Sequence, residues 1–251
     1  MPFAEASVHL YWQCHNRLQL LRGFDAKKIL FNSLIHGLSV RNLDSAIQLH
    51  AFCLMDNHVH QQVSYKSGVQ RLSRFMRLVN GKFGRNYNDK HGRSGAVLNS
   101  RPKTPVIQDE LQSQMRVHFY IEANPIRARI KTVQNLRTYF WNSYRLYAFG
   151  EIDQYTRYLT PPSWYLQLAN TAAERQRKYR ELFENYLKEV KLISFNPISR
   201  FIGGQNWSET QNERLRSWLR THHTGRGKVG SPPPKPSWPL SPSPQHLVTD
   251  P

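Results

Sequence analysis

The sequence predicts an α+β fold in which helices pack on one antiparallel sheet. β-rich and helical segments follow one another without the regular alternation of a doubly wound parallel sheet. Hydrophobic residues make up 39% of the 251-residue chain and aromatic residues 12%. This apolar content is enough for a core and excludes wholesale disorder.

Three apolar stretches are predicted to form strands. Residues 7–14 alternate and are rich in β-forming residues. The stretch 47–63 contains a second β-like run, in which Asp56 and Asn57 mark either a turn between two strands or a distortion within one. A short apolar run at 96–98 predicts a further strand.

Apolar residues recur at helical spacing in five segments, residues 25–37, 69–87, 109–123, 174–190 and 208–220. Asp25 is the candidate N-cap of the first helix, and Pro125 is expected to end the third. In the second helix, Arg and Lys fill the positions between the apolar residues, so that one face is basic.

The helical pattern weakens beyond residue 150, which divides the chain into three predicted parts. Residues 1–150 form the main domain and residues 151–224 a helical extension. Residues 225–251 are rich in Pro, Gly and Ser, a composition that predicts a disordered tail.

The chain has 35 Lys and Arg residues against 17 Asp and Glu residues, a net charge of +18. Half of this charge lies between residues 61 and 105, where ten basic residues are opposed only by Asp89. Such clustering favours a surface that faces phosphate groups, because cations that neutralise phosphates release counterions. The expected partner is therefore a polyanion.

No run of 18 apolar residues occurs, and the first residues lack a basic stretch followed by a long apolar one. We therefore expect no membrane span and no secretory signal, and a cytoplasmic protein. Cys14 and Cys53 fit no metal-binding or redox spacing, which indicates two reduced, partly buried thiols.

Two pairs of residues could carry chemistry. His58 and His60 are two apart on a predicted strand, so both imidazoles face one side and could bind one ion. Tyr120 and Asn124 are four apart on a predicted helix, so a hydroxyl and a carboxamide oxygen share a face. Each pair alone has an ordinary interpretation: two unrelated histidines, and a core tyrosine followed by an Asn-Pro helix stop.

Two motifs resemble those of a known family. The segment LMDNHVHQQV (residues 54–63) resembles the metal-binding strand of the single-tyrosine HUH transposases, where two histidines flank a bulky hydrophobic residue. The segment FYIEANPIRARI (119–130) is similar to the Tyr-Ile-x-x-Asn-Pro-x-Arg-Ala signature of their REP-associated branch. Three further features resemble that branch in residue type and in their order along the chain. They are the basic helix, the Gly-Arg-Ser-Gly loop at 92–95 and Trp-Asn-Ser-Tyr at 141–144. The resemblance runs from about residue 8 to residue 147.

The resemblance implies a ferredoxin-like catalytic domain over residues 1–150 that cleaves and rejoins single-stranded DNA, at palindromic hairpins, through a 5′-phosphotyrosine intermediate. It assigns Tyr120 as the nucleophile and His58, His60 and Asn124 as ligands of Mg²⁺ or Mn²⁺. The residues expected to contact DNA are Arg71, Arg74, Arg77, Lys82, Arg85, Arg101, Lys103 and Arg127.

Alternatives remain open for function and assembly. The same scaffold could regulate by binding nucleic acid without cutting it, and a histidine pair with a basic surface also suits an RNA-processing nuclease. Related enzymes act as homodimers that exchange the tyrosine helix, whereas the REP-associated kind is compatible with a monomer.

Overall fold

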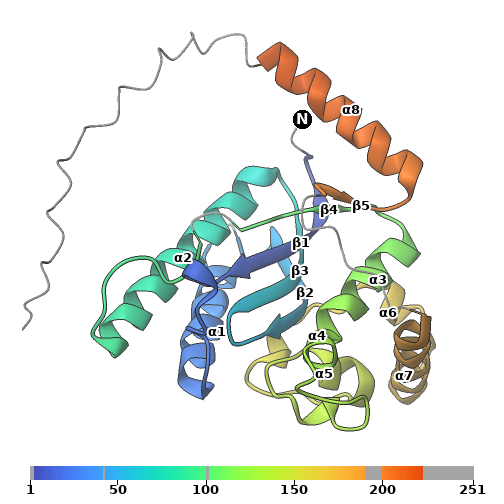
Figure 1. Ribbon diagram of the computed structural model, residues 1–251. Coiled ribbons are helices and arrows are strands. Elements are labelled where there is room, and N and C mark those ends of the chain that lie inside the picture. The colour runs from blue at the N-terminus through green and yellow to red at the C-terminus, as the bar shows by residue number, and fades with distance from the viewer. Residues whose placement is uncertain (1–2, 42, 100–101, 190–198, 223–251) are drawn as a thin grey trace, which may run out of the picture.

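The computed structural model describes residues 3–41, 43–99, 102–189 and 199–222. Five strands form one sheet in the order β2-β3-β1-β4-β5 (Figure 1). Their bounds are β1 (Ala6–Gln13), β2 (Ile47–Leu54), β3 (His58–Tyr65), β4 (Val106–Ile107) and β5 (Phe201–Ile202).

The sheet topology confirms the predicted fold class. Strands β1 to β4 pair antiparallel, in the order β2-β3-β1-β4. With one helix between β1 and β2 and another between β3 and β4, this order is the ferredoxin-like arrangement. Strand β5, from the C-terminal part of the chain, is added parallel to β4 at the edge.

The described helices are α1 (Phe24–Leu38), α2 (Val69–His91), α3 (Leu111–Glu122), α4 (Asn124–Arg127), α5 (Tyr144–Phe149), α6 (Ser163–Leu166), α7 (Ala172–Glu189) and α8 (Gln205–His222). Three short 3-10 turns accompany them at His15–Arg17, Leu136–Thr138 and Thr156–Tyr158. Within the described residues, every helix is too short or too polar to cross a membrane.

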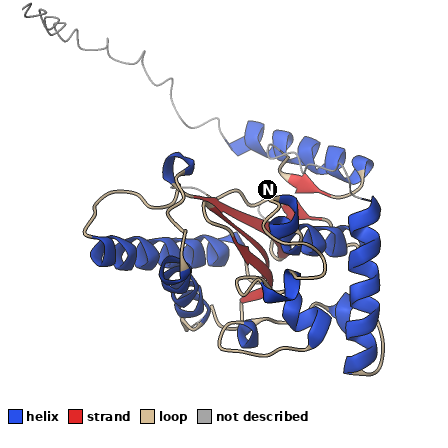
Figure 2. Ribbon diagram, turned by 60° about the horizontal axis from the view of Figure 1, so that its bottom comes forward, coloured by secondary structure: helices blue, strands red, loops and turns tan. Residues whose placement is uncertain are grey.

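The two faces of the sheet have different contents, because successive residues of a strand point to opposite sides. On one face, Val8, Leu10 and Trp12 of β1 join the apolar residues of α1 and α2 in the main core. On the other face, α3 packs against β2 and β3, and helices lie on both sides of the sheet (Figure 2). That second face presents the polar residues of β1 and β3.

Helix α7 contributes to the main core. Its Tyr179, Phe183 and Tyr186 are buried in the same apolar cluster as Phe119 of α3 and Tyr144 of α5. The predicted helix at 174–190 is thus present, although residue 190 lies outside the described residues. The tail predicted at 225–251 also lies outside them, and the division of the chain at residue 150 stays a prediction.

Some boundaries differ from those predicted. Asp56 and Asn57 form a turn between two strands. Residues 96–98 make only an isolated bridge from Leu98 to Cys14, and the fourth strand is Val106–Ile107 instead. Val97 and Leu98 are apolar because their side chains enter the core.

Of two predicted helix ends, one is corrected and one is confirmed. Gly23 is the N-cap of α1, with a φ of 92°, and Asp25 lies in the first turn, where its carboxylate pairs with Lys90 at 2.6 Å. An acid in the first turn also complements the helix dipole. Helix α3 ends at Glu122, with Ala123 as its C-cap, so it stops before Pro125 as predicted. Pro125 then lies in the first turn of the separate helix α4, where no backbone N–H is needed.

We predict that the domain loses stability as pH falls from about 6.5 to about 4. Burial lowers the pKa of His50 to about 4, so the unfolded chain takes up a proton in this window and the folded chain does not. The neutral ring holds Thr160 O at 2.7 Å and Ser64 Oγ at 2.8 Å. His50→Gln should flatten the pH dependence of the urea midpoint, and an unchanged dependence would contradict this assignment.

Candidate active site

The histidine pair lies on the face of the sheet covered by α3. His58 and His60 are two apart on β3, and their ring centroids are 4.9 Å apart. His60 is buried, whereas His58 is half-buried. Antiparallel pairing places Tyr11 of β1 opposite His60 and Gln13 opposite His58.

Tyr120 of α3 lies beside this pair. The centroid of its ring is 5.5 Å from that of His60 and 5.6 Å from that of His9, both in edge-on geometry. The guanidinium carbon of Arg127 is 5.0 Å from the Tyr120 centroid. Burial raises the pKa of the Tyr120 hydroxyl, and the positive charge of Arg127 opposes that rise.

Asn124 begins α4 and is buried. Its Nδ2 donates to the carbonyl oxygens of Tyr120 and Ile121, at 2.9 and 3.2 Å. Because the amide nitrogen is used in this way, Oδ1 is the end of the carboxamide left for the pocket. A hydrogen bond links the side chains of Asn124 and His58, and it partly offsets the lowering of the His58 pKa by burial.

Each histidine of the pair has a partner at Nδ1. His58 Nδ1 is 2.6 Å from Oδ1 of Asn57, and His60 Nδ1 is 2.8 Å from Nε2 of His9. When Nδ1–H donates, Nε2 keeps its lone pair for a ligand, and such outer partners are typical of metal-binding histidines.

Burial also keeps these rings neutral. It lowers the pKa of His9 to about 4 and that of His60 well below 6.5, with further lowering of the His60 pKa by His9, His58 and Arg127. Only neutral imidazole binds a metal, so these rings have the protonation state that a metal ligand needs.

The donor set fits a divalent cation. Among the described residues, no three His, Cys, Asp or Glu side chains are grouped so that they could hold a metal ion. A third protein ligand to an ion at this place would therefore be of another type, and the Asn124 carboxamide lies beside His58. Two imidazoles, one amide oxygen and water suit Mn²⁺ and are compatible with Mg²⁺.

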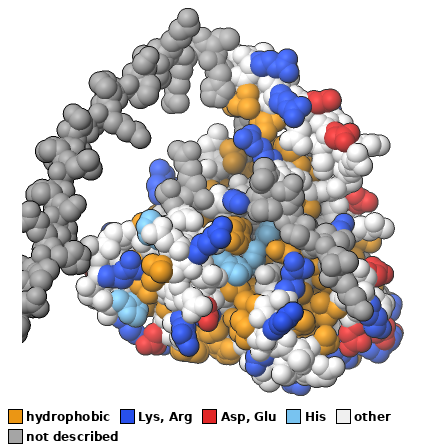
Figure 3. All heavy atoms as spheres, in the orientation of Figure 1, with side chains coloured by type: hydrophobic (Ala, Val, Ile, Leu, Met, Phe, Trp, Pro, Cys, Tyr) orange, Lys and Arg blue, Asp and Glu red, His pale blue; other side chains and the backbone are white. Residues whose placement is uncertain are grey.

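These side chains line one pocket of about 550 Å³. Its other lining residues include three cations, Arg17, Lys103 and Arg127, and no carboxylate lies among the lining residues that the structure describes. Figure 3 shows histidine side chains at the centre of this face with Lys and Arg side chains around them. The pocket therefore combines metal-ligand types with a positive rim.

The residues expected to contact DNA lie in two separate places. Lys103 and Arg127 line the pocket. The others that are described, Arg71, Arg74, Arg77, Lys82 and Arg85, belong to α2, which covers the opposite face of the sheet. Arg101 lies outside the described residues.

Among the pocket residues that sequence reasoning missed are His9, Tyr11 and Arg17. His9 and Tyr11 alternate on β1, a pattern that was visible, but only the pairing with β3 brings them to His60. Arg17 follows Asn16, and both have positive φ values of 58° and 53°. This uncommon backbone for non-glycine residues leaves no clear mark in the sequence.

We predict that His9→Phe weakens Mn²⁺ binding about tenfold, because it removes the partner of His60 Nδ1 while keeping a buried ring. Calorimetric titration of the apo protein with Mn²⁺ would measure this. His50→Gln is the matched control, since His50 is an equally buried histidine bonded outside the pocket. Equal Mn²⁺ affinities for the two variants would contradict the prediction.

Comparison with solved structures finds six chains that match. A REP-associated tyrosine transposase bound to a REP hairpin is 15% identical to this chain, with a TM-score of 0.48. The match covers 61% of this chain and 86% of that one. No curated protein matches the chain.

Comparison with family models finds the family described as "Transposase IS200 like", which matches residues 3–100. The matched residues contain His58 and His60 but end before Tyr120 and Asn124. They span less than half of the 251 residues. Over residues 3–100 the chain therefore has the sequence pattern of the IS200-like transposases, and this confirms the resemblance inferred from the sequence.

Proposed function

We propose that this protein is a metal-dependent transposase-type nuclease that cleaves and rejoins single-stranded DNA through Tyr120. The observation behind the proposal is the convergence of Tyr120, His58, His60 and Asn124 in one positively charged pocket. The IS200-like match over residues 3–100 supports transposase chemistry independently of this geometry.

In the proposed reaction, the Tyr120 oxygen attacks a backbone phosphorus and displaces the 3′-oxygen of the preceding nucleotide. The products are a 5′-phosphotyrosine and a free 3′-OH, and attack by that hydroxyl reverses the step. Because the phosphoester bond is exchanged rather than hydrolysed, no high-energy cofactor is needed.

The divalent ion, held by His58, His60 and Asn124, would polarise a phosphate oxygen and neutralise developing charge. The protein's own contribution is to orient and activate Tyr120. A tyrosine hydroxyl is a weak nucleophile at neutral pH, and burial makes its deprotonation harder. The cation of Arg127 over the ring acts in the opposite direction.

Substrate class follows from the pocket and from the motif around Tyr120. Arg17, Lys103 and Arg127 at the pocket provide three positive charges for successive phosphates of one strand. The Tyr-Ile-x-x-Asn-Pro pattern at 120–125 is that of the REP-associated branch, so we propose a DNA hairpin with a single-stranded flank.

All four proposed site residues come from one chain. Helix α3 packs on the sheet of its own chain, and Tyr120 contacts His60 within it. We therefore propose that a monomer contains a complete site, without exchange of the tyrosine helix.

We predict that incubation with labelled hairpin DNA and Mn²⁺ gives a protein–DNA adduct that survives denaturation and disappears with Tyr120→Phe or a chelator. Tyr11→Phe is the matched control, because Tyr11 is the other tyrosine that lines the pocket. Gel electrophoresis of the adduct measures the outcome. Hairpin binding without any wild-type adduct would favour the regulator, and an adduct on RNA alone would favour an RNA-processing nuclease.

We also predict that Lys103→Ala reduces the salt dependence of binding to a strand of about six nucleotides. Loss of one phosphate contact should lower the slope of log K against log salt concentration by about 0.7. Arg74→Ala is the control on the opposite side of the sheet, and for this short strand it should leave the slope unchanged. Fluorescence anisotropy at several salt concentrations measures both slopes. A slope that falls in Arg74→Ala and not in Lys103→Ala would contradict the prediction.

A further inference from the structure

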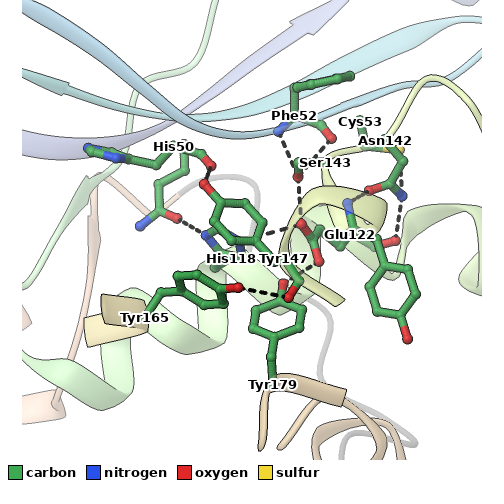
Figure 4. A network of polar contacts seen from close by, with 12 residues as sticks. His50, Phe52, Cys53, His118, Glu122, Asn142, Ser143, Tyr147, Tyr165 and Tyr179 are labelled. Atoms are coloured by element: carbon green, nitrogen blue, oxygen red, sulfur yellow. Dashed lines mark hydrogen bonds and ion pairs between the residues drawn. The ribbon is translucent and has the colours of Figure 1, made fainter. Parts of the chain in front are cut away.

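A buried carboxylate lies on the flank of α3 opposite the pocket. Glu122 has no exposed surface. Its Oε1 accepts a hydrogen bond from Ser143 Oγ at 2.6 Å, and its Oε2 accepts one from the Tyr179 hydroxyl of α7 (Figure 4). His118 Nε2 is 3.4 Å from Oε1. Burying a carboxyl group is costly unless its oxygens are hydrogen-bonded, so these partners are important for stability.

The same flank of α3 is tied to the strand of the histidine pair. Gln62 follows His60 by two residues on β3 and is fully buried. Its Oε1 accepts from His118 Nδ1 at 2.9 Å, and its Nε2 donates to Oε1 of Gln114 at 2.7 Å. Gln62 therefore bridges two successive turns of the tyrosine helix.

The spacing along α3 puts two sets of polar residues on different sides of the helix. Gln114, His118 and Glu122 are four apart and share one flank of the helix. Tyr120 and Asn124, also four apart, lie on the other side. On β3, alternate residues 58, 60 and 62 face α3, two toward the pocket and one toward this polar flank. Rotation or sliding of α3 would thus disturb both sides together.

We propose that the chain of polar contacts Gln62–His118–Glu122–Tyr179, two hydrogen bonds joined by the 3.4 Å approach of His118 to Glu122, sets the register of α3 over β3. Tyr179 is then a positioning residue for Tyr120 and Asn124. Helix α7, in the extension beyond residue 150, then belongs functionally to the active site. Only the catalytic consequence of this inference rests on the proposed function, because the register itself is a property of the apo protein.

The contribution of Tyr179 can be isolated from its packing. Its ring packs against Phe119 and Trp164, with centroids at 5.3 and 6.1 Å. Tyr179→Phe keeps these contacts and removes only the hydroxyl, which leaves Glu122 Oε2 without that donor. Because a buried acceptor without a donor is unfavourable, we expect α3 to shift when Glu122 loses this hydrogen bond.

The test compares Tyr179→Phe with Tyr165→Phe in the full chain. Tyr165 is also a buried tyrosine, but its hydroxyl donates to the Tyr147 carbonyl, not to α3. The main readout is the side-chain amide signal of Asn124 in ¹⁵N NMR of the apo protein, assigned by its loss in Asn124→Asp. The signal should move in Tyr179→Phe and keep its position in Tyr165→Phe, whatever either variant does to thermal stability.

Two further measurements test whether the register of α3 affects metal binding and DNA cleavage. Tyr179→Phe should weaken Mn²⁺ binding and slow adduct formation about tenfold each, as outer-shell changes do, while hairpin affinity stays the same. An unchanged Asn124 signal in Tyr179→Phe, or an equal change in Tyr165→Phe, would overturn the proposal.

If Tyr179→Phe fails to fold, Gln114→Ala breaks the half-buried end of the same chain and is read in the same way. Failure of the proposed function would instead appear as a wild type that forms no adduct, with the NMR comparison unaffected.

Discussion

The site depends on the antiparallel register between β1 and β3. That register places Tyr11 opposite His60 and His9 opposite Gln62, so that alternate residues of both strands share the face that α3 covers. A slip of one residue would turn His58 and His60 into the core behind α1 and α2, where Val59 and Val63 now lie. The apolar residues of β1 and β3 prevent that slip, and the hydrophobic core therefore fixes which polar groups can meet.

Burial affects the groups of this pocket in different ways. It removes protons from the histidines, whose pKa values fall, and so leaves them in the neutral form that the proposed metal binding requires. It holds the proton on Tyr120, whose pKa rises. A pocket without nearby positive charge would thus favour the ligands and disfavour the nucleophile. The positive charge of Arg127 over the Tyr120 ring opposes the rise in the pKa of the Tyr120 hydroxyl. The same charge lowers the pKa of His60 further.

Periodicity in the sequence predicted much of this arrangement, but only within each element. A period of two put His58 and His60 on one face, and a helical period put Tyr120 and Asn124 on one side. It could not predict which flank of α3 would meet β3, because that contact joins residues about 60 positions apart. Glu122 shows the same limit: a Glu on a helix suggests a solvated surface, and its burial depends on Tyr179, 57 residues later. Likewise, apolar character at 96–98 suggested a strand, although Leu98 forms only an isolated bridge and packs into the core.

The polar flank of α3 also connects α7 to a pocket that α7 itself does not line. Apolar contacts such as those of Val117 and Ile121 with the sheet stabilise α3, but they tolerate small shifts along it. The hydrogen bonds of Gln62, His118 and Glu122 have fixed partners, so a shifted helix would leave buried polar groups unpaired. Burial by α7 strengthens this penalty, because it keeps water from replacing a lost partner. The proposed nucleophile on α3 and the proposed metal ligand that follows it at the start of α4 require such a defined register, and an apolar interface alone would not supply it.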